Sequence, residues 1–71
     1  MFEYVRVIFE DQRDVFIAGK KMGRTNRKFR IGGGTYTFDL GEPKDYSPQR
    51  QKALVEDTTE DTPLEVHFAK V

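Results

Sequence analysis

The sequence predicts a small all-β domain, an antiparallel β-sandwich of six or seven short strands. Three observations lead to this fold class. Apolar and polar residues alternate along most of the chain, which is the period of a half-buried strand, and apolar residues seldom recur at helical spacing. Stretches rich in glycine, proline and acidic residues interrupt this alternation roughly every ten residues, as turns do in small β-sandwiches. The chain has 71 residues, which is enough for a single domain over residues 1–71.

Five runs carry the strand pattern, and the phase of each predicts which side chains face the core. These runs are 2–10, 14–18, 27–31, 35–40 and 63–71. The cleanest is 35–40, in which threonine or aspartate alternates with Tyr36, Phe38 and Leu40. The core is predicted to consist of Val5, Val7, Phe9, Val15, Ile17, Phe29, Ile31, Tyr36, Phe38, Leu64, Val66 and Phe68. A chain this short buries only a thin core, so its stability is expected to be marginal.

The stretches between the runs predict turns and loops. They are 10–14, 19–26, 32–34, 41–48 and 56–63, and the acidic stretch 55–63 is expected to be a mobile loop. Within 19–26, Lys20 and Lys21 are expected in a turn, with Gly19 and Gly23 supplying positive φ at both ends of a short hairpin. Thr25 is expected to fix the following turn through its hydroxyl group.

Residues 47–57 allow two structures. Ser47 is a suitable cap and Pro48 suits the first turn of a short helix, and good helix formers follow them. The same stretch can form an edge strand that pairs through Lys52 to Val55, with Pro48 confined to its start. We favour the strand because every neighbouring element is a strand.

The triple glycine at Gly32–Gly34 invites comparison with a phosphate-binding loop. Such loops join a strand to the amino terminus of a helix, whose amides bind the anion. Here the glycines lie between two strand-like runs, with no helix pattern and no lysine–serine pair after them. We therefore predict that they form a tight hairpin turn with positive φ.

A run of cations is the strongest candidate for a binding surface. No acidic residue occurs between Val15 and Phe38, and the cations there are Lys20, Lys21, Arg24, Arg27, Lys28 and Arg30. An exposed patch of this kind would attract phosphate groups, and Phe29 or Tyr36 would stack a base. The alternation at 28–31 favours a solvated strand face with Phe29 in the core, neutralised in part by the acids at 56–65. A protein-binding role comes second, and a nucleic-acid role third.

Catalysis and metal binding have little support in the sequence. There is no cysteine and one histidine, His67, which is expected on the solvent face of its strand, so no zinc or transition-metal site is expected. Ser47 is followed by Pro48 and lacks the glycine-flanked turn of a nucleophile elbow. The stretch "EDTTED" lacks the glycine and the ligand spacing of a calcium loop. We predict no catalytic residue, no cofactor and no metal.

Charge and hydropathy bear on partners and location. Twelve basic residues balance twelve acidic ones, so the net charge draws the chain neither to nucleic acid nor to an acidic membrane. No run approaches the roughly 18 apolar residues of a membrane span, so no membrane insertion is expected. The amino-terminal run contains charges, unlike a signal peptide. A full-length chain of this kind is expected in the cytoplasm, and for a fragment of a longer protein the location stays open.

The stretches "VFIAGKKMGRT" and "FRIGGGTYTFDL" together resemble the PEGA domain, a small all-β module of bacterial and archaeal proteins. The resemblance covers Val15 to about Tyr46, and the matching positions are Val15, Ile17, Gly19, Lys20, Gly23, Thr25, Ile31, Gly33, Gly34, Tyr36, Phe38, Leu40 and Tyr46. The signature that names the family is replaced by "EDQR", its usual aspartate by Ala18 and its usual proline by Asn26. The resemblance implies the all-β fold and a role in interactions or as a spacer, without catalysis.

The function that the sequence favours is that of a non-enzymatic interaction module, which binds protein or carbohydrate through a sheet face or a sheet edge. The alternative is a small nucleic-acid-binding β domain that uses the cations from Lys20 to Arg30. The pattern favours a protein partner, and it does not specify the oligomeric state.

Overall fold

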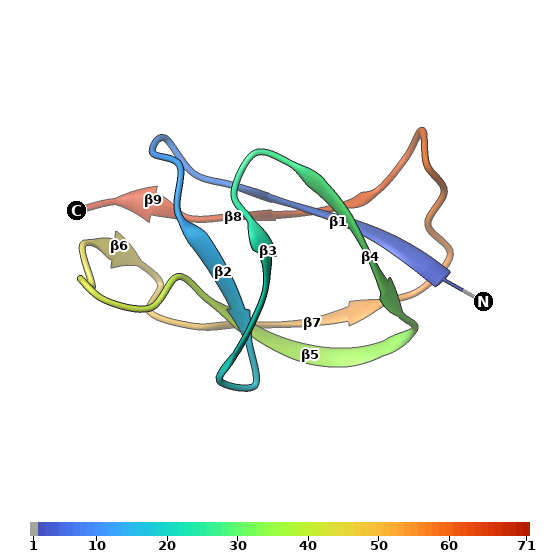
Figure 1. Ribbon diagram of the computed structural model, residues 1–71, viewed down its shortest axis with the longest axis horizontal. Helices are drawn as coiled ribbons and strands as arrows, with labels where there is room; N and C mark the ends of the chain where they lie inside the picture. Colours follow the sequence, from blue (N-terminus) through green and yellow to red (C-terminus); the bar gives the residue numbers. More distant parts are fainter. Residues whose placement is uncertain (1) are drawn as a thin grey trace.

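The computed structural model describes residues 2–71, and in this range the chain forms nine β-strands and no helix (Figure 1). The strands are β1 (Phe2–Ile8), β2 (Asp14–Ile17), β3 (Lys20–Arg24), β4 (Lys28–Gly32), β5 (Gly34–Asp39), β6 (Tyr46–Ser47), β7 (Gln51–Val55), β8 (Leu64–His67) and β9 (Ala69–Lys70). Seven of them have four residues or more. The predicted all-β class is confirmed.

Two sheets build the sandwich. The three-stranded sheet has the order β4-β1-β8, and the four-stranded sheet has the order β3-β2-β5-β7. The short strands β6 and β9 form a third pair. All pairs are antiparallel except β1 with β8, which is parallel. The predicted antiparallel arrangement therefore holds for every pair but this one, in which the long path through β2–β7 lets the chain return in the direction of β1.

The core lies between the two sheets and follows the predicted strand phases. Nine of the twelve predicted core residues are buried, and the other three, Phe29, Tyr36 and Leu64, are half-buried at its margin. Three further residues complete the core: Leu40, Tyr46 and Val55. Tyr46 was missed as a core residue because it follows a polar loop. Its ring packs edge-on against Phe9 and Phe68, with centroids 6.2 and 5.5 Å away.

Gly32–Gly34 do not close a hairpin, contrary to the prediction. Strand β4 pairs with β1, whereas β5 pairs with β2 and β7, so the glycines form the corner at which the chain passes from one sheet to the other. Of the three, only Gly34 has a positive φ, of 148°. Glycine suits the corner at Gly34, because an L side chain rarely adopts this positive φ.

Lys20 and Lys21 lie in strand β3, and the prediction of a turn at these residues is wrong. The turn is shorter, because Ala18 and Gly19, with φ of 52° and 81°, join β2 to β3 as a two-residue hairpin. Gly23 does not have positive φ: instead, the ring of Phe29 occupies the space of a Cβ, which would lie 2.8 Å from it. Strand β3 escaped prediction because none of its side chains is buried and no alternation results.

Residues 47–57 contain the strand β7 and no helix, as favoured. Strand β7 is an edge strand of the four-stranded sheet and pairs with β5 from Gln51 to Val55. Of the acidic stretch 55–63, Val55 is the last residue of β7 and residues 56–63 form a loop. Thr58 fastens this loop to β1 by accepting a 2.8 Å hydrogen bond from the amide of Tyr4.

Thr25 is the one buried polar residue among those described, and it binds the preceding loop instead of the following turn. Its hydroxyl group accepts a hydrogen bond from the amide of Arg13 and donates one to the carbonyl of Asp11, both at 2.8 Å. Next to it, the side-chain amide of Asn26 pairs with the backbone N–H and C=O of Phe9. These contacts hold the crossing from the four-stranded to the three-stranded sheet.

Candidate functional site

The structure divides the basic cluster between two sheets. Lys20, Lys21 and Arg24 belong to β3 in the four-stranded sheet, Lys28 and Arg30 belong to β4 in the three-stranded sheet, and Arg27 lies in the connection. The cations therefore belong to the edge strands of two different sheets and to the connection between them. Sequence proximity alone could not show this, because the chain changes sheet between the third cation and the fifth.

Three of these six cations form ion pairs with acidic side chains. Lys21 and Arg24 both contact the carboxylate of Asp14 on β2, at 3.6 and 3.8 Å. The ammonium of Lys28 lies 3.8 Å from the carboxylate of Glu60 and donates a 2.9 Å hydrogen bond to its carbonyl. Within residues 2–71, no carboxylate lies within 4 Å of the other three cations, which are Lys20, Arg27 and Arg30.

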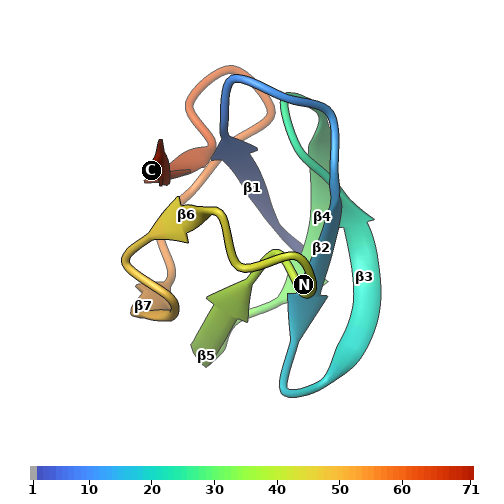
Figure 2. The same cartoon turned by 90° about the vertical axis from the view of Figure 1, so that its left-hand side faces the viewer.

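Strand β3 forms the first of two exposed surfaces whose side chains and backbone groups are suited to binding. It ends the four-stranded sheet and pairs with β2 only. In Figure 2 it lies at the outer border of the fold, far from β6 and β7. Its pairing with β2 skips Met22, which forms a bulge and is 45% exposed. The strand therefore presents one unpaired backbone edge surrounded by cations.

The outward face of the three-stranded sheet is the other such surface. Because Val5 and Val7 point into the core, Phe2 and Tyr4 point outward on the same strand. Cations from β4 cover them: the ammonium of Lys28 lies 5.8 Å from the ring centroid of Tyr4, and the guanidinium of Arg30 lies 5.0 Å from that of Phe2. Sequence reasoning missed this pair. The available signal was that β1 has apolar residues on both faces.

An open hollow of about 400 Å³ adjoins these cation–aromatic pairs. Its lining residues are Tyr4, Lys28, Phe29, Arg30 and Glu60. It therefore combines an aromatic wall with two cations and one carboxylate. These groups can stack against a planar ring, bind an anion and accept a hydrogen bond.

The two aromatic residues proposed from the sequence as base-stacking groups are engaged elsewhere. Phe29 is half-buried and packs over Gly23. Tyr36 is half-buried, donates a 2.7 Å hydrogen bond from its hydroxyl group to the carbonyl of Gly32, and packs edge-on against Phe38. The aromatic rings that contact exposed cations are those of Phe2 and Tyr4 on β1.

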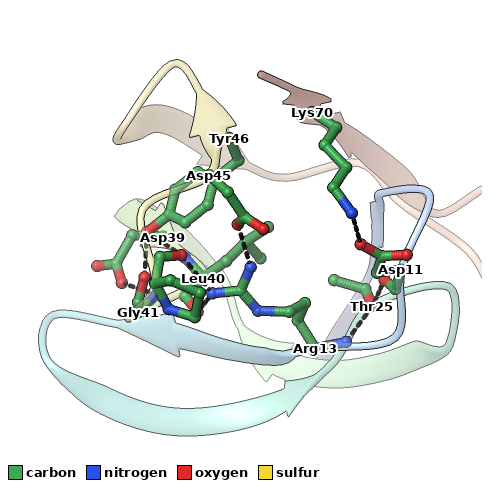
Figure 3. A network of polar contacts seen from close by, with 10 residues as sticks. Asp11, Arg13, Thr25, Asp39, Leu40, Gly41, Asp45, Tyr46 and Lys70 are labelled. Carbon is green, nitrogen blue, oxygen red and sulfur yellow. Dashed lines mark hydrogen bonds and ion pairs between the residues drawn. The ribbon is translucent and has the colours of Figure 1, made fainter.

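A polar network around Arg13 joins the loop after β1 to the loop after β5 (Figure 3). The guanidinium donates hydrogen bonds to the carboxylate of Asp45 at 2.5 Å and to the carbonyls of Leu40 and Pro43 at 3.1 and 2.7 Å. It also lies 5.4 Å from the ring centroid of Tyr46. The Arg13 side chain is only 14% exposed, so the network is structural. One arginine in a polar turn gives no sequence signal for this role.

Hydrogen bonds shift the pKa of three charged groups. The hydrogen bond from Arg13 lowers the pKa of Asp45 from its ordinary value of 3.8, against a smaller opposing effect of desolvation. Hydrogen bonds from Thr58 lower the pKa of Glu3 from 4.5. On the opposite side of the network, Lys70 donates a 2.5 Å hydrogen bond to Asp11, which raises the pKa of Lys70 above 10.5. Each of these pairs fastens a loop or a chain end to the sandwich.

The remaining candidate groups are dispersed. His67 lies on the solvent side of β8, as expected, and its Nε2 is 3.4 Å from the Glu65 carboxylate. Across residues 2–71, no group of three or more His, Cys, Asp or Glu side chains is placed to hold a metal ion. In the same range, no helix could cross a membrane.

Comparison of this chain with family models, with curated proteins and with solved structures found no match.

Proposed function

We propose that this chain is a non-enzymatic interaction module that binds an extended, acidic segment of a protein along the edge strand β3. The observation that carries the proposal is the position of β3 at the end of the four-stranded sheet, where it is paired on one side only. An unpaired strand edge offers a row of backbone N–H and C=O groups to an added strand. Recognition of this kind uses the backbone for affinity and alternate side chains for selectivity.

Among the edge strands, β3 contributes the fewest buried side chains to the core. Strands β4, β7 and β8 each bury an aliphatic side chain, namely Ile31, Val55 and Val66. Strand β3 buries none, because all four of its side chains are exposed. Strand β7 also contacts the neighbouring sheet, because the side-chain amide of Gln51 donates to the carbonyl of His67 on β8. The edge of β3 is therefore the most open to a further strand.

Charge selects the partner. Pairing of two β3 strands would bring lysine and arginine against lysine and arginine, which is unfavourable for side chains directly opposite each other. The Met22 bulge interrupts regular pairing as well. An acidic strand would meet Lys20, which has no carboxylate within 4 Å among residues 2–71, and Lys21 and Arg24, which share one carboxylate. The partner that fits is thus an acidic segment and not a second copy of this strand.

Two further points support an interaction module over an enzyme. The titratable side chains Lys21 and Arg24 on the edge strand and Asp14 beside it form simple surface ion pairs. The PEGA domain, which residues 15–46 resemble, is a family taken to mediate interactions or to act as a spacer.

The test is a binding measurement with a defined probe. A fluorescein-labelled peptide of about eight residues that alternates glutamate and valine should bind the wild-type protein, as followed by fluorescence anisotropy. The Lys20→Glu variant should weaken binding about tenfold, since it replaces an attraction by a repulsion at the edge. A peptide that alternates lysine and valine should not bind.

The matched control is Lys52→Glu on β7, the opposite edge of the same sheet. It changes the net charge equally and should leave the affinity for the acidic peptide within about twofold of wild type. Equal weakening by the two variants, or no binding of the acidic peptide to wild type, would refute the proposal.

A further inference from the structure

We infer that the outward face of the three-stranded sheet binds single-stranded nucleic acid, with Phe2 and Tyr4 stacking against bases and Arg30 binding a phosphate. This surface lies on the other sheet from β3, and the inference does not depend on the β3 proposal. It rests on the placement of two aromatic rings, one cation without an acidic partner and the adjoining hollow.

The aromatic rings are arranged for two bases. Phe2 and Tyr4 are two residues apart on one strand, which separates their side chains by about 6.8 Å along the sheet. Phe2 is 61% exposed. Its paired residue on β4 is Gly32, which has no side chain, and the guanidinium of Arg30 from the same strand lies 5.0 Å from its ring centroid. Unstacked bases of a single strand are bound in this way on aromatic side chains of open sheets, and the stacking tolerates any base.

Arg30 supplies the charge. It is the partner of Tyr4 in the pairing of β1 with β4 and lies over the ring of Phe2. Within the described chain, its guanidinium makes no hydrogen bond and has no carboxylate within 4 Å. A planar fork of donors held against an aromatic ring can bind a phosphate with two parallel hydrogen bonds. Lys28 differs, because Glu60 already holds its ammonium.

The hollow beside these groups has room for one nucleotide. Its volume is about 400 Å³, and Tyr4, Arg30 and Glu60 are among the residues that line it. The Glu60 carboxylate can accept a hydrogen bond from the amino or imino group of a base. In a duplex these edges are paired and the ring faces are stacked, so the site suits a single strand.

The other charged groups on this face are paired, so nucleic-acid binding there should depend more on base stacking than on electrostatic attraction of phosphates. Arg6 lies 4.0 Å from Glu65, and His67 contacts the same carboxylate, so these groups add little free positive charge. The chain has no net charge. Binding should therefore involve one or two phosphates and depend on the aromatic rings, with a modest dependence on salt.

The experiment uses a fluorescein-labelled oligothymidylate of about ten nucleotides, titrated with protein at about 20 mM salt. Wild type should bind, and Tyr4→Ala and Arg30→Ala should each weaken the affinity about tenfold. The matched controls are Leu54→Ala, an apolar residue 54% exposed on the other sheet, and Arg50→Ala, an exposed cation outside the strands. Both should stay within about twofold of wild type, with unchanged thermal unfolding in all four variants.

Salt and a polyanion without bases separate stacking from charge. Raising the salt tenfold should weaken the affinity about 5- to 25-fold, as expected for one or two phosphates on a single strand. Heparin should compete poorly. The inference is overturned if wild type does not bind at low salt, if Tyr4→Ala binds as well as wild type, or if heparin displaces the oligonucleotide at equal charge. Lys20→Glu should leave oligonucleotide binding unchanged, so the two proposals fail separately.

Discussion

The guanidinium of Arg13 contacts the carboxylate of Asp45 at 2.5 Å, across 32 residues of sequence. The contact joins the loop after β1 to the loop that leads into β6. Beside it, the hydroxyl group of Tyr46 donates a 2.8 Å hydrogen bond to the carbonyl of Gly41 and accepts one from the amide of Leu40. Buried polar groups of a loop that runs against a core need such partners, and here one arginine and one tyrosine provide them.

Arg13→Ala should lower the free energy of unfolding by about 1–3 kcal/mol, because it leaves backbone carbonyls and a carboxylate without their donor. Arg13→Lys should recover only part of the loss, since an ammonium cannot reproduce the planar fork. Urea unfolding followed by circular dichroism measures both values. Arg50→Ala is the control on an exposed arginine, and a loss as small as in that control would show that the network does not stabilise the fold.

Acid should destabilise the protein through Asp45. The folded state holds the pKa of Asp45 below its ordinary value of 3.8, so the ionised carboxylate stabilises the fold above that pH. The contribution is lost as the pH falls through the lower folded-state pKa. Melting temperatures measured between about pH 2 and pH 6 should therefore fall on the acid side, with a smaller fall in Asp45→Asn. Identical pH profiles of the variant and wild type would contradict this assignment.

Alanine substitutions at two glycines allow the cost of a positive φ to be measured apart from the cost of a steric clash. Gly19 has a φ of 81° and open space around it, whereas Gly41 has a φ of 70° and an added Cβ would lie 2.7 Å from the ring of Phe16. Gly19→Ala should cost about 1–2 kcal/mol from its backbone conformation alone. Gly41→Ala should cost about 1–3 kcal/mol more, because the ring must move. If chemical denaturation shows the same loss of unfolding free energy in both variants, the ring of Phe16 moves aside without an energetic penalty.

Phe38→Ala should unfold the domain at ambient temperature. Phe38 is fully buried near the end of β5, and its removal costs about 3–5 kcal/mol in transfer free energy and cavity formation. A domain of this size has only a few kcal/mol to lose. A variant that melts within a few degrees of wild type in differential scanning calorimetry would show that the core is assigned wrongly. Thr35→Ala, exposed on the same strand, is the control.

The alternation of apolar residues predicted most of the fold because it records burial directly. Val5, Val7 and Phe38 are buried as their phase requires. The alternation does not show which strands pair with each other. For this reason the triple glycine is predicted as a hairpin turn, although it forms a corner between two sheets. Strand β3 was missed for a related reason: an edge strand without buried side chains has no periodicity to detect.

The candidate site was less predictable than the fold. The six cations were visible in the sequence, but their division between two sheets depends on the crossing at Thr25 and Asn26. Phe2 and Tyr4 were missed although β1 has apolar residues on both faces, because outward aromatic residues on such a strand resemble further core residues. The hydrogen-bond partners of Arg13 lie about thirty residues away in the sequence, so only the folded structure shows that they are in contact.

The most direct test of the main proposal is amide chemical-shift mapping by NMR during titration with the acidic peptide. We expect the largest shifts at residues 20–24 of β3, with little change at residues 51–55 of β7 on the opposite edge of the same sheet. Shifts concentrated on β7, or spread evenly over both sheets, would contradict binding at the β3 edge.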